Sequence, residues 1–282
     1  MLNTPIKPML MHKSDAVPTD NYIHQLKWDG FRCLMHYDGQ QFRLFTRHQN
    51  ECTLQFPEMK NVQVDVKNVI LDGEMIVLNS DNVPCFESVM SRFQASNELS
   101  IRRGVKTMPA HFVAYDILYL NNKDITKLPL KERLDILYDT VHLSKEISAS
   151  ESYQNGDELF HLISQMGLEG IVSKRKDSLY HLDTRSSHWL KVKNYQYETV
   201  SISALRKKDF GWSLLHKEKH VGVMELVPSN ERKAFWEISK QLQIGEDKNW
   251  IYLDPIVKCK VKFQSYTKNG LMRSPSFIEF IY

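Results

Sequence analysis

Apolar and polar residues alternate in short runs along the first two thirds of the chain, as in half-buried strands. The runs at 31–36 and 41–46 flank a segment that contains an Asp-Gly pair, and this pair is favoured in tight hairpin turns. We therefore expect a β-hairpin here. Further strands are predicted at 69–78, 111–120, 170–174 and 189–193.

Two stretches instead show helical spacing. Leucines at 130, 134 and 137 fall on one helical face. The apolar positions at 159–166 follow an Asn-Gly-Asp start signal at 155–157 and end before Gly167, a residue that commonly closes helices. Antiparallel-looking strands mixed with a few helices predict an α+β domain.

The pattern changes after Tyr195. Strands are predicted at 199–205, 212–216, 220–227 and 256–263, with one helix at 231–242. That number of strands with one helix is the size of a small closed barrel such as an OB-fold. We expect two domains, residues 1–195 and 196–282, joined by a short hinge near 194–198.

Composition is ordinary for a globular protein, with 42% hydrophobic and 25% charged residues. The four cysteines form no C-x-x-C pair, which argues against a disulfide framework or zinc site and suits a reducing cytosol. The start of the chain has no apolar core of signal-peptide length, and no stretch approaches 18 apolar residues. We expect a cytoplasmic protein without a membrane segment.

Charge is unevenly distributed. Residues 196–282 carry 14 Lys and Arg against 10 Asp and Glu, a net +4, whereas the remainder carries a net −1. A basic C-terminal part is compatible with contact to nucleic-acid phosphates, and equally with scattered solvated lysines.

The common phosphate-binding motifs are missing. No glycine is followed by lysine, and no two glycines are spaced as G-x-G, which excludes the P-loop, the dinucleotide fingerprint and the kinase glycine loop. Any nucleotide chemistry must use another device.

Lys27 begins such a device, the string K-W-D-G-F-R. An unprotonated lysine amine can attack a phosphate, provided that nearby cations or desolvation lower its pKa from the usual value of about 10.4. Asp29 offers a carboxylate to a metal ion, Gly30 allows close backbone approach, and Arg32 offers a guanidinium fork to phosphate or ribose. A surface turn with a salt-bridged lysine is the simpler alternative.

The string resembles motif I of the covalent nucleotidyltransferases, which comprise DNA ligases, RNA ligases and mRNA capping enzymes. Similar motifs follow in order over nearly the whole chain: T-R-H-Q-N and F-P-E at 46–58, L-D-G-E at 71–74, F-E-S-V-M-S-R at 86–92, Y-D-I-L-Y at 115–119, E-G-I-V-S-K at 169–174, W-L-K-V-K at 189–193 and L-M-R-S-P-S-F at 271–277. The resemblance is to ATP-dependent DNA ligases, and most of all to small bacterial or bacteriophage enzymes and the ligase module of bacterial end-joining proteins.

This resemblance implies a nucleotidyltransferase domain followed by an OB-fold, and it implies roles for individual residues. Lys27 would carry the AMP, with Lys191, Lys193 and Arg32 as further catalytic residues. Asp116 would contact metal or ribose. The implied ATP site comprises Gln25, Leu26, Lys27, Arg32, Arg47, Glu74, Tyr115, Lys191 and Lys193; the metal site, Glu169 and Asp29; and the DNA contacts, Arg47, Arg185 and Arg273.

Several of these residues also have plainer explanations. Tyr115 would stack on adenine, although aromatic residues in apolar strands usually pack in a core. Lys191 and Lys193 leave the same face of one strand, as two phosphate ligands or an exposed edge would. The chain departs from the family pattern at Gln25, where many relatives have glutamate, at His48 and Gln49, which replace Asn-Gly, at Asp183, where relatives often have glycine, and in motif VI, which lacks a following R-x-D-K string.

The implied reaction has three steps assisted by Mg²⁺ or Mn²⁺. Lys27 attacks the ATP α-phosphate and expels pyrophosphate, the AMP passes to the 5′-phosphate at a nick in double-stranded DNA, and the 3′-hydroxyl displaces the AMP. We expect a minimal, monomeric enzyme without the large N-terminal DNA-binding domain of eukaryotic replicative ligases. A capping guanylyltransferase, an RNA ligase and an inactive nucleic-acid-binding relative are the alternatives.

Overall fold

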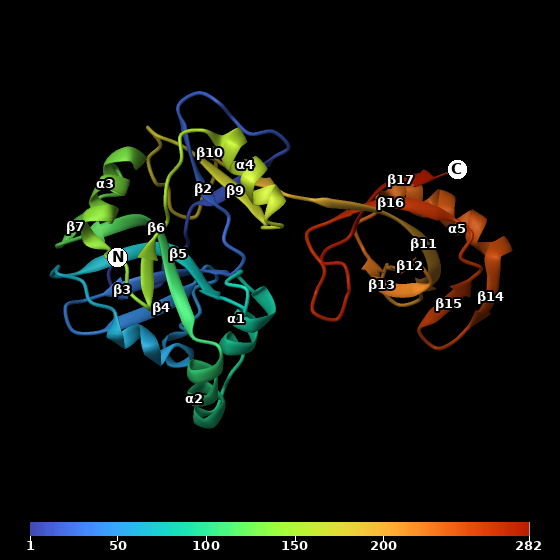
Figure 1. Ribbon diagram of the computed structural model, residues 1–282, viewed down its shortest axis with the longest axis horizontal. Helices are drawn as coiled ribbons and strands as arrows, with labels where there is room; N and C mark the ends of the chain where they lie inside the picture. Colours follow the sequence, from blue (N-terminus) through green and yellow to red (C-terminus); the bar gives the residue numbers. More distant parts are fainter. Residues whose placement is uncertain (282) are drawn as a thin grey trace. The chain divides into compact units, whose positions relative to one another are not determined.

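A computed structural model describes residues 1–281 and divides them into two compact units. The first unit is Met1–Lys193 and the second begins at Asn194, two residues before the boundary expected from the sequence (Figure 1). Each unit has its own hydrophobic core.

The larger sheet of the first unit has six strands in the order β4-β3-β5-β6-β7, with β8 added to β6. The predicted hairpin at 31–46 is confirmed as β3 and β4, and Gly39 takes a φ of +97° in its turn. All pairs are antiparallel except β6 with β8. The strands are β3 (Phe31–Tyr37), β4 (Phe42–Thr46), β5 (Val69–Val77), β6 (Ala110–Leu120), β7 (Lys123–Asp124) and β8 (Ile147–Ala149).

A second, four-stranded sheet has the order β1-β10-β9-β2. The sequence predicted β9 (Gly170–Arg175) and part of β10 (Arg185–Lys193), but it did not reveal β1 (Leu10–Ser14) or β2 (Tyr22–Leu26). β1 runs parallel to β10 with a register shift after Met11, so its side chains do not follow one uninterrupted alternation. The sheet is therefore mixed rather than purely antiparallel.

Four helices accompany these sheets in the first unit: α1 (Phe86–Phe93), α2 (Glu98–Thr107), α3 (Leu130–Thr140) and α4 (Gly156–Gln165). The last two confirm the helical predictions. The Asn155 side chain accepts a hydrogen bond from the Glu158 amide at the start of α4, and Gly167 takes a φ of +67° just after it. The short helical turns are η1 (Thr53–Gln55) and η2 (Pro57–Asn61).

Two of the family-like segments are partners in the fold. The guanidinium of Arg92, near the end of α1, donates to both carboxylate oxygens of Glu58 at 2.7 and 3.0 Å. Arg92 is 1% exposed, and a Cβ on Gly104 would lie 2.5 Å from its side chain. The F-P-E segment and the arginine-ended helix therefore stabilise one another through a buried ion pair.

The second unit is a curled sheet with one helix, as expected for an OB-fold (Figure 1). The long strand β11 pairs with β12 along one edge and with both β16 and β15 along the other, which bends the sheet on itself. Trp212 packs against Phe235, Phe277 and Phe280 in the core. The elements are β11 (Gln196–Arg206), β12 (Trp212–His216), β13 (Lys219–Met224), α5 (Ser229–Leu242), β14 (Gln243–Glu246), β15 (Trp250–Leu253), β16 (Lys258–Phe263) and β17 (Ser276–Ile281).

Within residues 1–281, none of the helices combines the length and apolar character that crossing a membrane would require.

Candidate active site

A cavity lies between the two sheets of the first unit. Its wall includes residues of β1, β2, β9 and β10 from the four-stranded sheet and of β3, β5 and β6 from the six-stranded sheet. Two strands that the sequence did not reveal, β1 and β2, therefore help to build it. The lining residues are Met11, Gln25, Leu26, Lys27, Trp28, Arg32, Glu74, Tyr115, Val172, Lys174 and Trp189.

Lys27 follows β2 directly and is held beside β9. Its backbone amide donates to the Gly170 carbonyl at 2.9 Å. Gly170 begins β9 with a φ of +140°, and a Cβ there would lie 2.2 Å from the carbonyl oxygen of Val192 on β10. Only glycine therefore lets β9 and β10 approach this closely. The Lys27 Nζ then lies 2.7 Å from Glu169 Oε2 and remains 18% exposed. The backbone thus places an accessible amine beside a carboxylate.

Further cations surround this pair. The Lys193 Nζ lies 3.8 Å from the other oxygen of Glu169. Burial lowers the pKa of Lys191, and the positive charges of Lys27, Arg185 and Arg47 lower it further. The structure therefore brings five predicted residues, one carboxylate and four of the cations, into a single electrostatic neighbourhood around Lys27.

Glu74 is the second acidic residue of the cavity wall. Burial raises its pKa to about 8, against the attraction of Lys27, and the negative charge of Glu169 raises it further. A Cβ on Gly30 would lie 2.2 Å from the Met75 carbonyl oxygen and 3.0 Å from the Glu74 side chain. Gly30 therefore allows the Lys27 turn to pack on β5, and the raised pKa of Glu74 favours its neutral form, which can donate a hydrogen bond.

Arg32 lines the cavity, but its fork is engaged within the protein. It donates to both oxygens of Asp72 at 2.9 and 2.6 Å, to the Met9 carbonyl and to the Tyr180 hydroxyl. Asp72 is fully buried and also accepts from Tyr180 at 2.7 Å. The fork that was expected to grip a phosphate or ribose holds Asp72 in this structure.

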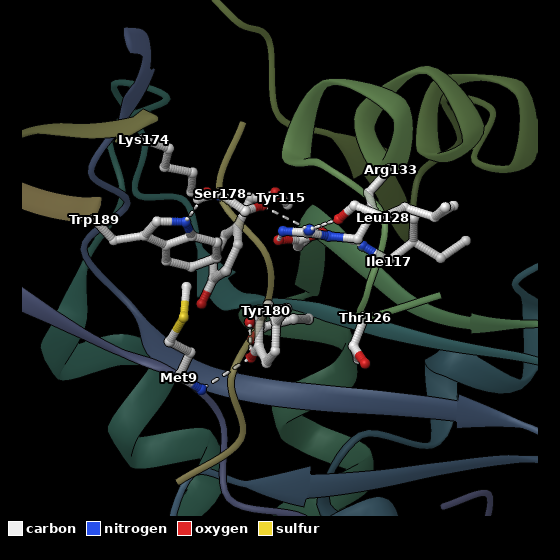
Figure 2. A network of polar contacts seen from close by, with 12 residues as sticks. Met9, Tyr115, Ile117, Thr126, Leu128, Arg133, Lys174, Ser178, Tyr180 and Trp189 are labelled. Carbon is white, nitrogen blue, oxygen red and sulfur yellow. Dashed lines mark hydrogen bonds and ion pairs between the residues drawn. The ribbon is translucent and has the colours of Figure 1, made fainter. Parts of the chain in front are cut away.

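Asp116 has a similar partner. Both of its oxygens accept hydrogen bonds from Arg133 of α3, at 2.8 and 2.9 Å, and both side chains are fully buried. Arg133 also donates to the carbonyls of Leu128 and Ser178 (Figure 2). Asp116 thus forms an ion pair that joins α3 to β6, and its contact with metal or ribose stays a prediction.

Lys174 is a cavity residue to which the sequence assigned no role. Its Nζ donates to the Tyr115 carbonyl at 2.8 Å and lies 4.5 Å from the Tyr115 ring and 4.1 Å from the Trp189 ring (Figure 2). Burial lowers its pKa to about 7. The sequence predicted a strand at 170–174, but a short strand pattern does not show which of its polar residues faces a cavity.

Tyr115, Gln25 and Leu26 also line the cavity. Gln25 is 1% exposed, and its Oε1 has no hydrogen-bond partner among the described residues. A buried acceptor without a partner costs free energy unless a ligand satisfies it, so Gln25 fits a site that receives a hydrogen-bond donor.

Some predicted residues of the first unit, such as Asp29, Arg47 and Arg185, are not among the residues that line the cavity. Asp29 lies in the turn between β2 and β3, past the last lining residue of that turn, Trp28. Arg47 is exposed after β4, and Arg185 begins β10 and donates to the Met11 carbonyl at 2.5 Å. Arg273 belongs to the second unit, where its amide bonds to the Ser265 carbonyl. The predicted DNA contacts of these arginines stay predictions.

The residues around Lys27 fit a nucleotide and its metal ion. Among the described residues, no three side chains of the His, Cys, Asp and Glu types are grouped as a metal cage. Mg²⁺ bound to nucleotides, however, usually takes one or two carboxylates and completes its shell with phosphate oxygens and water. Glu169 supplies a carboxylate next to the cations that phosphates require, so the donor set matches that mode.

A comparison with protein families decides the family. Residues 1–193 match the model of the ATP-dependent DNA ligase domain. The chain belongs to the ATP-dependent DNA ligases. A prophage-derived DNA ligase-like protein LigB of Bacillus subtilis is 36% identical over 278 residues, covering 96% of this chain and 97% of that protein. The comparison thus favours the DNA ligases over the capping enzymes.

Longer ligases match in part. The end-joining protein LigD of Mycobacterium tuberculosis is 28% identical over 89% of this chain, which spans 35% of that protein. The solved ligase domain of M. tuberculosis LigD has a TM-score of 0.60 at 22% identity over 98% of this chain and 95% of that one. A Lig E DNA ligase, described as binding DNA with a minimal scaffold, has a TM-score of 0.69 at 18% identity, covering 98% and 99%. These two similarities confirm the ligase fold.

Proposed function

We propose that this chain seals nicks in double-stranded DNA through an AMP carried on Lys27. The Lys27 amine supports the proposal most strongly, because it is 18% exposed at a cavity wall and lies 2.7 Å from Glu169. Lys191 and Lys193 lie on β10, which pairs with the strand β9 that follows Glu169. An attacking amine needs access and positive charge around the phosphate that it attacks. Both are provided within this part of the first unit.

In the first step, the Lys27 Nζ lone pair forms a bond to the α-phosphorus of ATP, and the bond from that phosphorus to pyrophosphate breaks. Glu169 would hold Mg²⁺ or Mn²⁺, which would neutralise charge on the phosphates. Lys191 and Lys193 stabilise the phosphate oxygens.

Other cavity residues hold the nucleoside. We assign Tyr115 to stacking on the adenine, Gln25 and Leu26 to its edge, and Glu74 to the ribose. Arg32 acts through its charge and by holding Asp72 and Tyr180 beneath the cavity, whereas Arg47 and Arg185 extend the positive surface toward the nucleic acid. Asp29 remains a candidate for the metal shell.

In the second and third steps, the AMP passes from Lys27 to the 5′-phosphate at the nick, and the 3′-hydroxyl oxygen then attacks that phosphate and releases AMP. We assign the second unit, through Arg273 and its +4 charge, to the DNA. We further propose that the enzyme is a monomer and acts in the cytoplasm, where ATP and DNA are both present.

The test is a labelling and sealing experiment. The protein is incubated with ATP or GTP labelled in the α-phosphate, and nicked duplexes with DNA or RNA strands are offered afterwards. A covalent adduct formed from ATP, absent in Lys27→Ala, together with sealing of the DNA nick supports the proposal. Labelling only by GTP, or an adduct that persists in Lys27→Ala, contradicts it. Sealing of RNA nicks only would make the chain an RNA ligase.

A further inference from the structure

The amide of Gln25 lies between the nucleotide cavity and a segment behind it. Its Nε2 donates to the Ser152 hydroxyl at 3.1 Å and to the Ser150 carbonyl at 3.4 Å, whereas its Oε1 has no partner. Many relatives have a glutamate here, and both oxygens of its carboxylate accept hydrogen bonds. A glutamine has one acceptor and one donor end, so its function depends on which end faces the cavity.

The groups behind Gln25 restrict the orientation of its amide. The Tyr138 hydroxyl can donate to the Ser150 carbonyl at 3.1 Å, and it lies 2.6 Å from the Ser152 hydroxyl, where either group can be the donor. In both cases a lone pair of Ser152 accepts from Gln25 Nε2. Turning the amide over would place Oε1 against the Ser150 carbonyl oxygen, which cannot donate. The Ser150 carbonyl therefore selects one orientation of the amide, and the Ser152 hydroxyl supports it.

The segment that carries these serines is itself fixed. The Ser150 amide donates to the Ala114 carbonyl of β6 at 2.7 Å, and Tyr153 exchanges two backbone hydrogen bonds of 2.8 and 2.9 Å with His24 of β2. The Trp28 indole donates to the Ser150 hydroxyl at 3.3 Å. Both ends of the segment are thus tied to strands that build the cavity.

We propose that Ser152 and Tyr138 are positioning residues that hold the Gln25 amide with its oxygen toward the nucleotide, so that the enzyme selects a purine with a 6-amino group. This inference rests on the proposed function. An acceptor at this position bonds to the 6-amino group of adenine and opposes the 6-oxo group of guanine. The selectivity of the site is therefore set by hydroxyl groups that touch no nucleotide.

The first test compares Ser152→Ala with the wild type in adduct formation from ATP, GTP and purine ribonucleoside triphosphate, which lacks the 6-amino group. We expect the KM for ATP to rise about three- to tenfold with little change in kcat, as for loss of one oriented hydrogen bond. The KM for purine ribonucleoside triphosphate should stay nearly constant. Equal losses for both nucleotides would contradict the proposal, because they would indicate general damage to the cavity.

The second test uses Gln25→Glu as the background. A carboxylate accepts from either oxygen, so Ser152→Ala should change the KM for ATP by less than about twofold in that background. The same penalty in both backgrounds would overturn the positioning role. Thermal melting of all four proteins shows whether any loss follows from unfolding.

Tyr138→Phe should have a smaller effect than Ser152→Ala, because it removes the hydrogen bond between Tyr138 and Ser152 and leaves Ser152 in place. Tyr153→Phe is the matched control, since Tyr153 is similarly exposed and its hydroxyl bonds to Glu151 at 2.6 Å. An equal effect of both variants would contradict the chain of bonds. If the wild type forms no adduct with ATP, the proposed function fails; if it does and Ser152→Ala behaves identically, only this inference fails.

Discussion

Two ion pairs beside the same cavity are built in different ways. Arg32 and Asp72 are 8% and 0% exposed, are joined by two hydrogen bonds, and share Tyr180. Lys27 and Glu169 are 18% and 8% exposed and are joined by one contact. In the first pair Arg32 lines the cavity but its partner Asp72 is fully buried, whereas in the second pair the Lys27 amine is the more exposed group and also lines the cavity.

This difference suits the first pair to a structural role and the second pair to the proposed reaction. A bidentate guanidinium pair in a buried site fixes geometry, and a guanidinium does not lose its proton in proteins. An ammonium is a compact charge that can become a neutral amine, and its partner carboxylate can be shared with a metal ion. The sequence string K-x-D-G-x-R thus supplies one residue to each pair.

The largest expected effect is on the reactive pair. Lys27→Ala should reduce adduct formation and nick sealing below detection, because the nucleophile is gone. Lys27→Arg should be equally inactive, since its guanidinium remains protonated. Radiolabel transfer and gel-based sealing measure this. The free energy of unfolding in urea should change by less than about 1 kcal/mol, because a partly exposed pair adds little stability. A large loss of stability would show that the Lys27 pair is as structural as the Arg32 pair.

Arg32→Ala tests the framework pair. It leaves Asp72 buried without its partner, so the free energy of unfolding should fall by about 3–5 kcal/mol. Urea denaturation followed by fluorescence measures the loss. Arg43→Ala is a control, because Arg43 pairs with the exposed Glu51 and should cost about 1 kcal/mol or less. Equal losses in the two variants would show that Arg32 is not a framework residue.

Glu169→Gln should slow adduct formation by about 100-fold, the usual size of an electrostatic contribution to a charged transition state. The amide keeps the shape of the side chain but offers a metal ion less charge. Raising the Mg²⁺ or Mn²⁺ concentration should recover part of the rate. An unchanged rate at low metal concentration would remove Glu169 from the metal site.

The smallest expected effect concerns Lys174 and pH. Burial lowers its pKa from 10.5 to about 7, so the unfolded chain binds more protons than the folded one between these values. This group therefore destabilises the fold most below pH 7, and the penalty fades as pH rises toward 10.5. Replacing this group in Lys174→Met should stabilise the fold relative to wild type by about 3 kcal/mol more at pH 6 than at pH 9. Thermal melts at both pH values measure it, and a pH-independent difference would contradict the shift.

Prediction from the sequence succeeded where a pattern is local. The hairpin of β3 and β4, the strands β5 and β6, and the helices α3 and α4 have periods and end signals that a few neighbouring residues define. It failed for β1 and β2, because five-residue strands with an interrupted alternation give no period. It also left Lys174 without a role.

The sequence by itself determined the family, the order of the motifs and the lysine that we assign to the AMP, because these depend on residue identity and spacing along the chain. Only the tertiary structure decided which charges are paired and buried and which stay accessible. Arg32 and Asp116 looked alike in the sequence as candidates for ligand contacts, and the structure places Asp72 and Arg133, distant in sequence, against them. The reason is physical: a charge acts according to its partners and burial, and both are set by strands that meet only in the folded protein.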